Sequence, residues 1–239
     1  MAYGSQPRWT VRTADTRVDL DVGLRQYMLR IYNYMASALA LTGIVAYVFA
    51  GYLETNRALV HSPVMWLIIF APFGLVMLLS FGINRLSAAA AQGIFWLYAG
   101  LMGLSMSTIF LTYTGTSIAR VFFITAGTFT AMSLYGYTTK RDLSQFGSFL
   151  FMGLIGIVIA SLVNMFLQNG MLQWIISVIG VVVFVGLTAW DTQSIKEMYF
   201  EGDGHEMAGK KAVMGALRLY LDFVNLFMML IQIMGVRRN

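Results

Sequence analysis

The chain has 239 residues, 58% of them hydrophobic and only 11% charged, whereas a soluble domain has about 25% charged residues. This composition excludes a soluble enzyme and predicts a polytopic helical membrane protein, because a membrane-spanning helix needs about 20 consecutive apolar residues. The absence of cysteine excludes disulfides and thiol catalysis, and the formal net charge of +5 needs no nucleic acid partner, because the basic residues fit a membrane topology.

The N-terminus is polar and basic. Five arginines lie within the first 30 residues, which contain no apolar core of the signal-peptide type. We therefore expect residues 1–26 to form a retained cytoplasmic arm, largely disordered up to about Leu24.

Apolar segments fill the rest of the chain, so residues 27–239 are predicted to form a transmembrane domain of seven helices. Residues 143–190 contain no charged side chain over 48 positions. That run is too long for one helix, so the turn-forming residues 168–170 (Gln-Asn-Gly) should divide it. Pro63 suits a first helical turn. The expected spans are approximately 27–52, 63–81, 92–113, 118–137, 146–167, 171 onward, and 212–236.

The distribution of lysine and arginine predicts the orientation. With the N-terminus inside, the inner segments carry eleven of the 16 basic residues and the outer segments carry four, in agreement with the positive-inside rule. The C-terminus is then outside, although Arg237 and Arg238 would favour the inside if the last span were re-entrant.

The last predicted span carries a stripe of polar side chains. Arg218, Asp222, Asn225 and Gln232 are spaced by four, three and seven residues and fall within about an 80° arc of a helix. Polar groups are costly in contact with lipid, so this stripe should face other helices or water inside the bundle. We therefore expect the last span to lie centrally.

A second carboxylate, Asp191, ends the long uncharged run at the inner end of the sixth span. For Asp191 and Asp222 to meet, the sixth helix should continue to about Phe200. Two carboxylates close together at low dielectric cannot both ionise cheaply, so such a pair would share a proton and titrate as a unit. Plainer alternatives remain open: Asp222 can form an intrahelical ion pair with Arg218, and Asp191 can be a solvated helix end.

Several enzyme classes lack their residues in this sequence. His61 and His205 lie in connections, so an intramembrane serine protease would have no buried base, and no HExxH zinc motif is present. An intramembrane aspartyl protease uses two aspartates on adjacent helices, but its Gly-x-Gly-Asp motif is missing, because residues 219–221 (Leu-Tyr-Leu) precede Asp222. We therefore expect no enzymatic activity and no cofactor.

The string LRLYLDFVNLF at 217–227, with DTQSIK at 191–196, resembles the Bax inhibitor-1 family, and in particular its bacterial YccA-like branch. The strings GTFTAMSLYG at 127–136 and KRDLS at 140–144 are also similar to the family. The resemblance covers about residues 25–236. It implies a bacterial inner-membrane protein in which six helices surround a central C-terminal seventh.

The resemblance also implies a proton-sensitive calcium leak. Asp191 and Asp222 match the family's pair of aspartates, which acts as the pH sensor. Arg85 is the best match to an arginine that latches onto this pair in the closed state. The chain lacks a carboxylate in its second span and has Gln232 late in its last span, so it departs from members that carry a second ionic gate.

We therefore predict a pH-gated calcium (cation) leak channel whose partners are the lipid bilayer, calcium and protons. Calcium prefers about six to eight oxygen ligands, so Asp191 and Asp222 would form at most a weak, transient site for the permeant ion. The competing hypothesis is a non-conducting regulator that uses the N-terminal arm to bind a membrane AAA protease, as YccA-like relatives suggest, or a death-pathway partner. An intramembrane aspartyl protease is a distant third.

Overall fold

The structure is a computed structural model that describes residues 9–238, with side chains described from residue 22 onward except that of His61. Within these residues, seven helices are long and apolar enough to cross a membrane, which confirms the predicted all-helical fold. A short 3-10 helix, η1 (Arg57–His61), joins the first two spans. The spans are α1 (Trp9–Thr55), α2 (Pro63–Gly82), α3 (Ala88–Thr112), α4 (Gly115–Thr138), α5 (Ser144–Leu167), α6 (Gly170–Glu197) and α7 (His205–Met234).

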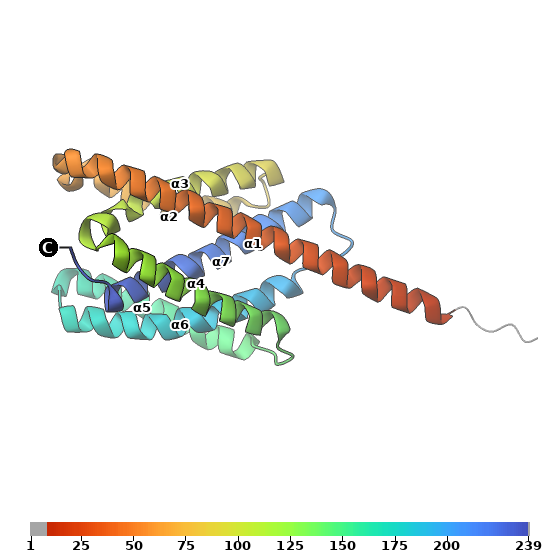
Figure 1. Ribbon diagram of the computed structural model, residues 1–239. Helices are drawn as coiled ribbons and strands as arrows, with labels where there is room; N and C mark the ends of the chain where they lie inside the picture. Colours follow the sequence, from red (N-terminus) through yellow and green to blue (C-terminus); the bar gives the residue numbers. More distant parts are fainter. Residues whose placement is uncertain (1–8, 239) are drawn as a thin grey trace, which may run out of the picture.

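The C-terminal helix α7 lies at the centre of the bundle, as predicted. In its most apolar window 67% of the residues are buried, compared with 11–33% in the other six spans. Helices α1, α3, α4 and α6 pack directly against it, whereas α2 packs mainly on α3, and α5 on α6. Figure 1 shows α7 running through the bundle behind α1.

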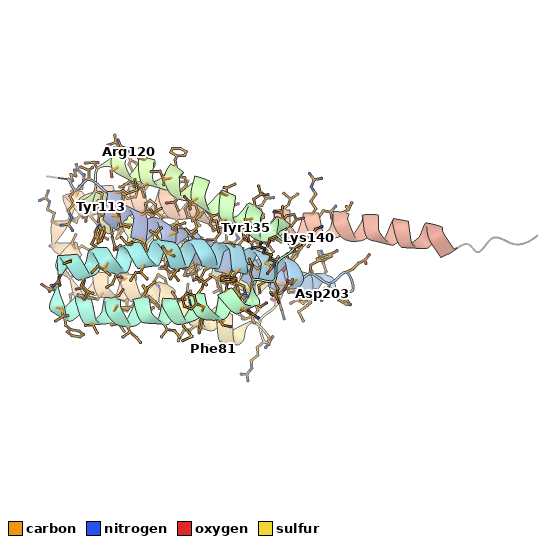
Figure 2. The ribbon with its side chains drawn as sticks, turned by 90° about the horizontal axis from the view of Figure 1, so that it is seen from below. Phe81, Tyr113, Arg120, Tyr135, Lys140 and Asp203 are labelled. Atoms are coloured by element: carbon orange, nitrogen blue, oxygen red, sulfur yellow. The ribbon has the colours of Figure 1, made fainter. Side chains whose placement is uncertain are left out.

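The two ends of the bundle carry different connections. The α4–α5 and α6–α7 loops lie at one end, here called the loop end, and the C-terminus lies at the other, here called the C-terminal end (Figure 1). Figure 2 shows Lys140 and Asp203 at the loop end, and Tyr113 and Arg120 at the opposite end. Charged and polar groups thus gather at both ends, as expected of helices that cross a membrane.

The C-terminal residues are held against the turn between α3 and α4. The backbone N–H of Arg238 donates to the Thr112 carbonyl at 2.8 Å, and its guanidinium contacts Glu54 at the end of α1 at 2.6 Å. The last helix therefore crosses the whole bundle and is not re-entrant. Which end faces the cytoplasm stays a prediction.

The break between α5 and α6 lies where the turn-forming residues predicted it. Gln168 adopts a left-handed conformation with φ of 50°, which ends α5 in the manner of an αL cap. The Asn169 side chain then accepts the N–H groups of Met171 and Leu172 and so caps the start of α6. Pro63 occupies the first turn of α2, also as predicted.

The loop between α6 and α7 is shorter than the sequence indicated. Helix α6 ends at Glu197, three residues earlier than expected, and α7 begins at His205, seven residues earlier than expected. The ammonium of Lys211 donates to the Met198 carbonyl at 2.9 Å and to the Asp203 carboxylate. This basic residue therefore forms part of a structured helix start and does not mark a flexible linker.

Helix α1 begins at Trp9, so the backbone of the predicted arm is helical from that residue onward, where we expected disorder. Residues 9–22 contain neither glycine nor proline, and extending an existing helix is much easier than nucleating a new one. Residues 1–8 lie outside the described residues. The interpretation of 1–26 as a separate functional arm stays a prediction.

Candidate functional site

The structure brings together the two carboxylates that the sequence placed on adjacent spans. Asp191 in α6 and Asp222 in α7 are buried, with 9% and 4% of their surface exposed. Their carboxyl groups are neighbours, close enough to share a hydrogen bond if one of them is protonated. Two carboxylates offer only acceptors, so this bond requires that one of them hold a proton. We call Asp191 and Asp222 the carboxyl pair.

The carboxyl pair forms although its members lie at different depths along their helices. Asp222 lies 17 residues after the start of α7, about 26 Å along the axis, whereas Asp191 lies six residues before the end of α6, about 9 Å. Helix α7 therefore extends further past the pair toward the loop end than α6 does. Because α7 starts early and the loop before it is short, the two aspartates meet although α6 does not extend to Phe200 as expected.

One carboxyl oxygen of the pair has no hydrogen-bond donor while both carboxyl groups are ionised. The Oδ2 atom of Asp222 is buried and accepts no hydrogen bond from any described residue. Burying a polar oxygen without a partner costs free energy, and this cost falls on the most buried helix of the bundle. Such incompletely satisfied groups are more typical of functional sites than of structural cores.

The ion-pair partner of the carboxyl pair is Arg218. Its Nη1 atom lies 3.9 Å from Oδ1 of Asp191, and 43% of its side chain is exposed. The bond therefore joins α7 to α6, and among the described residues no ion pair joins Arg218 to Asp222 within α7. The sequence spacing left that intrahelical pair open as an alternative, because it could not show that Asp191 approaches the same turn.

Arg85, the predicted latch, forms no ion pair with the carboxyl pair in this conformation. It is exposed in the turn that follows α2, a helix that packs on α3 and not on α6 or α7. No ion pair between Arg85 and a carboxylate is found in the part of the chain that the structure describes. Its role as a latch stays a prediction.

The remaining members of the polar stripe form their hydrogen bonds with other partners than the carboxyl pair. Asn225 donates to the Leu221 carbonyl of its own helix at 2.9 Å. The Oε1 atom of Gln232 accepts from Gln173 at 2.6 Å and from Ser177 at 2.7 Å, both on α6. The Gln173 side chain accepts in turn from an amide of α5 at 2.9 Å. We call Asn164, Gln173, Ser177 and Gln232 the amide cluster.

Sequence reasoning did not single out Gln173 or Ser177. Both belong to the long uncharged run, where a neutral polar side chain does not by itself mark a functional position. A usable signal was present, because the two residues are four positions apart and therefore share one face of a helix. Gln232, near the end of the next span, must form hydrogen bonds inside the membrane, and this face of α6 can provide them.

The residues that follow Asp191 fix the end of α6 to α4 and its loop. Thr192 exchanges a hydrogen bond of 3.0 Å with Ser133 of α4. Gln193 accepts from the N–H of Leu143 and donates to a carbonyl in the α4–α5 loop, both at 2.8 Å. Lys196 donates to the Tyr137 carbonyl at 2.9 Å, and its ammonium lies 5.1 Å from the centre of that tyrosine ring. These bonds fix the position of Asp191 from the α4 side.

The carboxyl pair by itself is a sparse metal site. Among the described residues, no group of three or more His, Cys, Asp or Glu side chains is placed to hold a metal ion. Calcium prefers about six to eight oxygen ligands. Two aspartates can therefore supply only part of a calcium coordination shell.

Comparison with known proteins identifies the chain's relatives. Residues 24–239 match the family described as inhibitor of apoptosis-promoting Bax1. The chain is 49% identical to the uncharacterized protein RP147 of Rickettsia prowazekii, over 96% of this chain and 98% of that protein. It is also 49% identical to the inner membrane protein YbhL of Escherichia coli, over 94% of this chain and 97% of that protein. An uncharacterized protein of Borreliella burgdorferi is 43% identical over 90% of this chain and 93% of its own length.

The matched region contains all seven spans apart from the first residues of α1, and it includes the carboxyl pair. The relatives align over nearly their full lengths, so the likeness concerns the whole bundle and not an isolated segment. Together with the central position of α7, this match shows that the chain belongs to the Bax inhibitor-1 family.

Proposed function

We propose that this protein is a pH-sensitive cation leak channel of the bacterial inner membrane, with calcium as the permeant ion, and that the carboxyl pair is its proton sensor. The observation that carries the proposal is the close approach of two buried carboxyl groups on α6 and the central helix α7, with Arg218 beside them. Its location in the inner membrane is supported by the seven spans and by the likeness to YbhL. Buried ionisable groups inside a membrane bundle are functional candidates by default.

The charge of the carboxyl pair would control the contact between α6 and α7. With one shared proton the pair carries a single negative charge, which the nearby Arg218 guanidinium balances. A second proton makes the pair neutral and removes the attraction between Asp191 and Arg218. The two helices are then held together less strongly at this level, so we expect the leak to increase as the pH falls.

Calcium would bind to the carboxyl pair only transiently as it crosses the membrane. A site that binds an ion too tightly does not conduct it, so conduction favours a weak site with incomplete coordination. The free Oδ2 atom of Asp222 and the Asp191 carboxylate provide such a site. No cofactor enters this scheme.

The test is calcium flux into liposomes that contain only this protein, measured as a function of pH. The wild type should conduct more at acid pH, and Asp222→Asn should lose most of that pH response because an amide does not titrate. Asp142→Asn is the matched control: Asp142 is exposed between α4 and α5, and hydrogen bonds from Ser144 lower its pKa. A wild-type protein without calcium flux at any pH would overturn the proposal.

We also propose that the carboxyl pair has no catalytic role. An aspartyl protease would need its two aspartates in the sequence setting that this enzyme class shares, and the residues before Asp222 do not provide it. A purified sample that cleaves a membrane-spanning peptide, and loses that cleavage in Asp222→Asn, would contradict this view.

A regulatory role is the second candidate, and one feature of the fold favours it. Helix α1 extends beyond the other helices at the loop end (Figure 1). This projecting part of α1 is a segment that a partner protein could bind. The resemblance to YccA-like proteins points to a membrane AAA protease as that partner. Deletion of residues 1–24 separates the two functions: a channel keeps its flux, whereas a regulator loses its partner.

A further inference from the structure

A deep groove lies between α1 and α4. Its volume is about 1030 Å³, and α7 is visible between the two helices in Figure 1. Aromatic side chains of α4 and α7 form its floor, where the rings of Phe129 and Phe223 meet edge to face at 5.6 Å. Along α1 the lining runs from Arg25 to Ile44, which is 19 residues or about 28 Å.

The groove opens toward the lipid. Its rim carries exposed apolar side chains from membrane-spanning segments of both helices, including Leu29, Ile44 and Leu134, which are 50–63% exposed. A large exposed apolar groove is typical of a binding site, and this one is open to the molecules that surround the protein. In a bilayer the surrounding molecules that fit an apolar, laterally open groove are lipid chains.

One end of the groove is positively charged. Arg25 is exposed at the loop end of the groove and precedes the uncharged stretch that begins at Ile31 by six residues, about 9 Å. That distance places its guanidinium near the level of lipid headgroups. Lys140 and Arg141 follow α4 at the same end and are also exposed. No carboxylate is among the described residues that line the groove.

We propose that this groove binds one anionic phospholipid, with an acyl chain between α1 and α4 and the phosphate at Arg25. A guanidinium pairs with phosphate oxygens through two parallel hydrogen bonds. The additional negative charge of an anionic headgroup is attracted by Lys140 and Arg141. The proposal depends on the membrane-spanning fold and not on the channel function.

The bound chain would lie against residues that lead to the carboxyl pair. Phe223, in the floor of the groove, follows Asp222 directly in α7. Tyr32 of α1 and Ser133 of α4 line the groove and share a hydrogen bond of 2.5 Å. Ser133 also bonds to Thr192, the residue after Asp191. The lipid therefore packs against the same contacts that position both aspartates.

The experiment is native mass spectrometry of the full-length protein, released from detergent after incubation with phosphatidylglycerol or with phosphatidylethanolamine of the same chains. The wild type should retain one phosphatidylglycerol, several-fold more than phosphatidylethanolamine. Gly43→Trp should lose most of this lipid, because a side chain at Gly43 meets no atom within 4 Å and projects into the groove. Gly74→Trp is the matched control, since Gly74 is equally open but lies on α2, outside the groove.

A second pair of variants tests the headgroup. Arg25→Gln should retain several-fold less of both lipids, because both contain the phosphate that Arg25 would bind, whereas Arg57→Gln, beyond the other end of α1, should retain as much as the wild type. Equal lipid retention in Gly43→Trp and wild type would overturn the proposed site. Equal retention in Arg25→Gln and wild type would overturn the role of Arg25, and a wild type without headgroup preference would overturn that of Lys140 and Arg141. A lipid-free dimer that dissociates in Gly43→Trp would instead show that a second copy occupies the groove.

Discussion

The same two helices, α6 and α7, make polar contacts of opposite character at two levels. At the level of Asp191 and Asp222 the contact is ionisable, and a buried oxygen lacks a partner. At the level of Gln173 and Gln232 the contact consists of neutral amides and the Ser177 hydroxyl, and the hydrogen bonds of this cluster measure 2.6–2.9 Å. Both regions keep polar side chains away from lipid by pairing them between helices. Only the first region contains ionisable groups and can change its charge.

This difference assigns separate tasks to the two regions. Hydrogen bonds between neutral amides do not depend on pH in the physiological range, so the amide cluster holds α5, α6 and α7 together under all such conditions. The carboxyl pair contributes an attraction that depends on its protonation. A helix pair with one constant and one variable contact can loosen at one level while staying assembled at the other.

The largest expected effect comes from removing the variable contact. Either Asp191→Asn or Asp222→Asn should reduce the pH response of calcium flux by on the order of tenfold, which corresponds to about 1.4 kcal/mol of proton-linked free energy. The double variant should lose no more than either single variant, because the two groups titrate as one unit. Flux measured across a pH series would check this. Additive losses in the double variant would show that the aspartates act independently.

A smaller effect is expected from the arginine beside the carboxyl pair. In Arg218→Ala the ionised pair loses its nearby positive charge, so a second proton binds at higher pH and the flux curve should shift toward alkaline pH. Because the Arg218 side chain is 43% exposed, solvent screening should keep this shift below about one pH unit.

Arg85→Ala is the comparison that distinguishes the two arginines. If Arg85 is the latch that the family resemblance implies, its removal should raise flux at neutral pH and flatten the pH response. The exposed position of Arg85 in the turn after α2 means that such a latch would need another conformation. A flux curve that shifts in Arg218→Ala and is unchanged in Arg85→Ala would assign the latch to Arg218.

Much of this architecture could be predicted from local features of the sequence. The length of the apolar runs predicted seven spans, and the Gln168–Gly170 turn divided the long run correctly because glycine and asparagine favour a break. The polar stripe predicted a central α7, since a helix cannot present such a stripe to lipid. Each of these inferences depends on residues close together in the chain.

The features that were missed depend on how helices sit relative to one another. The sequence left open a pair between Arg218 and Asp222, and only the structure shows that Asp191 is the ion-pair partner. The same limit hid the amide cluster, whose members come from three helices. It also hid the groove, because nothing in the sequence of α1 or α4 indicates that these two helices are separated.

The smallest effect on the pH response should come from the constant contact. Gln232→Leu leaves Gln173 and Ser177 without a shared acceptor, and stability should fall by about 1 kcal/mol because hydrogen bonds inside membrane bundles are modest. Thermal unfolding in detergent would measure this loss. The flux-versus-pH curve should keep its midpoint, since no titrating group has changed.

A double variant tests whether the amide cluster acts as a network. Replacing both Gln173 and Gln232 with leucine removes a donor together with its acceptor, so it should cost less than the sum of the two single changes. Simple additivity would mean that the two amides contribute separately. A shift of the pH midpoint in any of these variants would show that the two levels of the α6–α7 contact are coupled, and that the amide cluster belongs to the sensor.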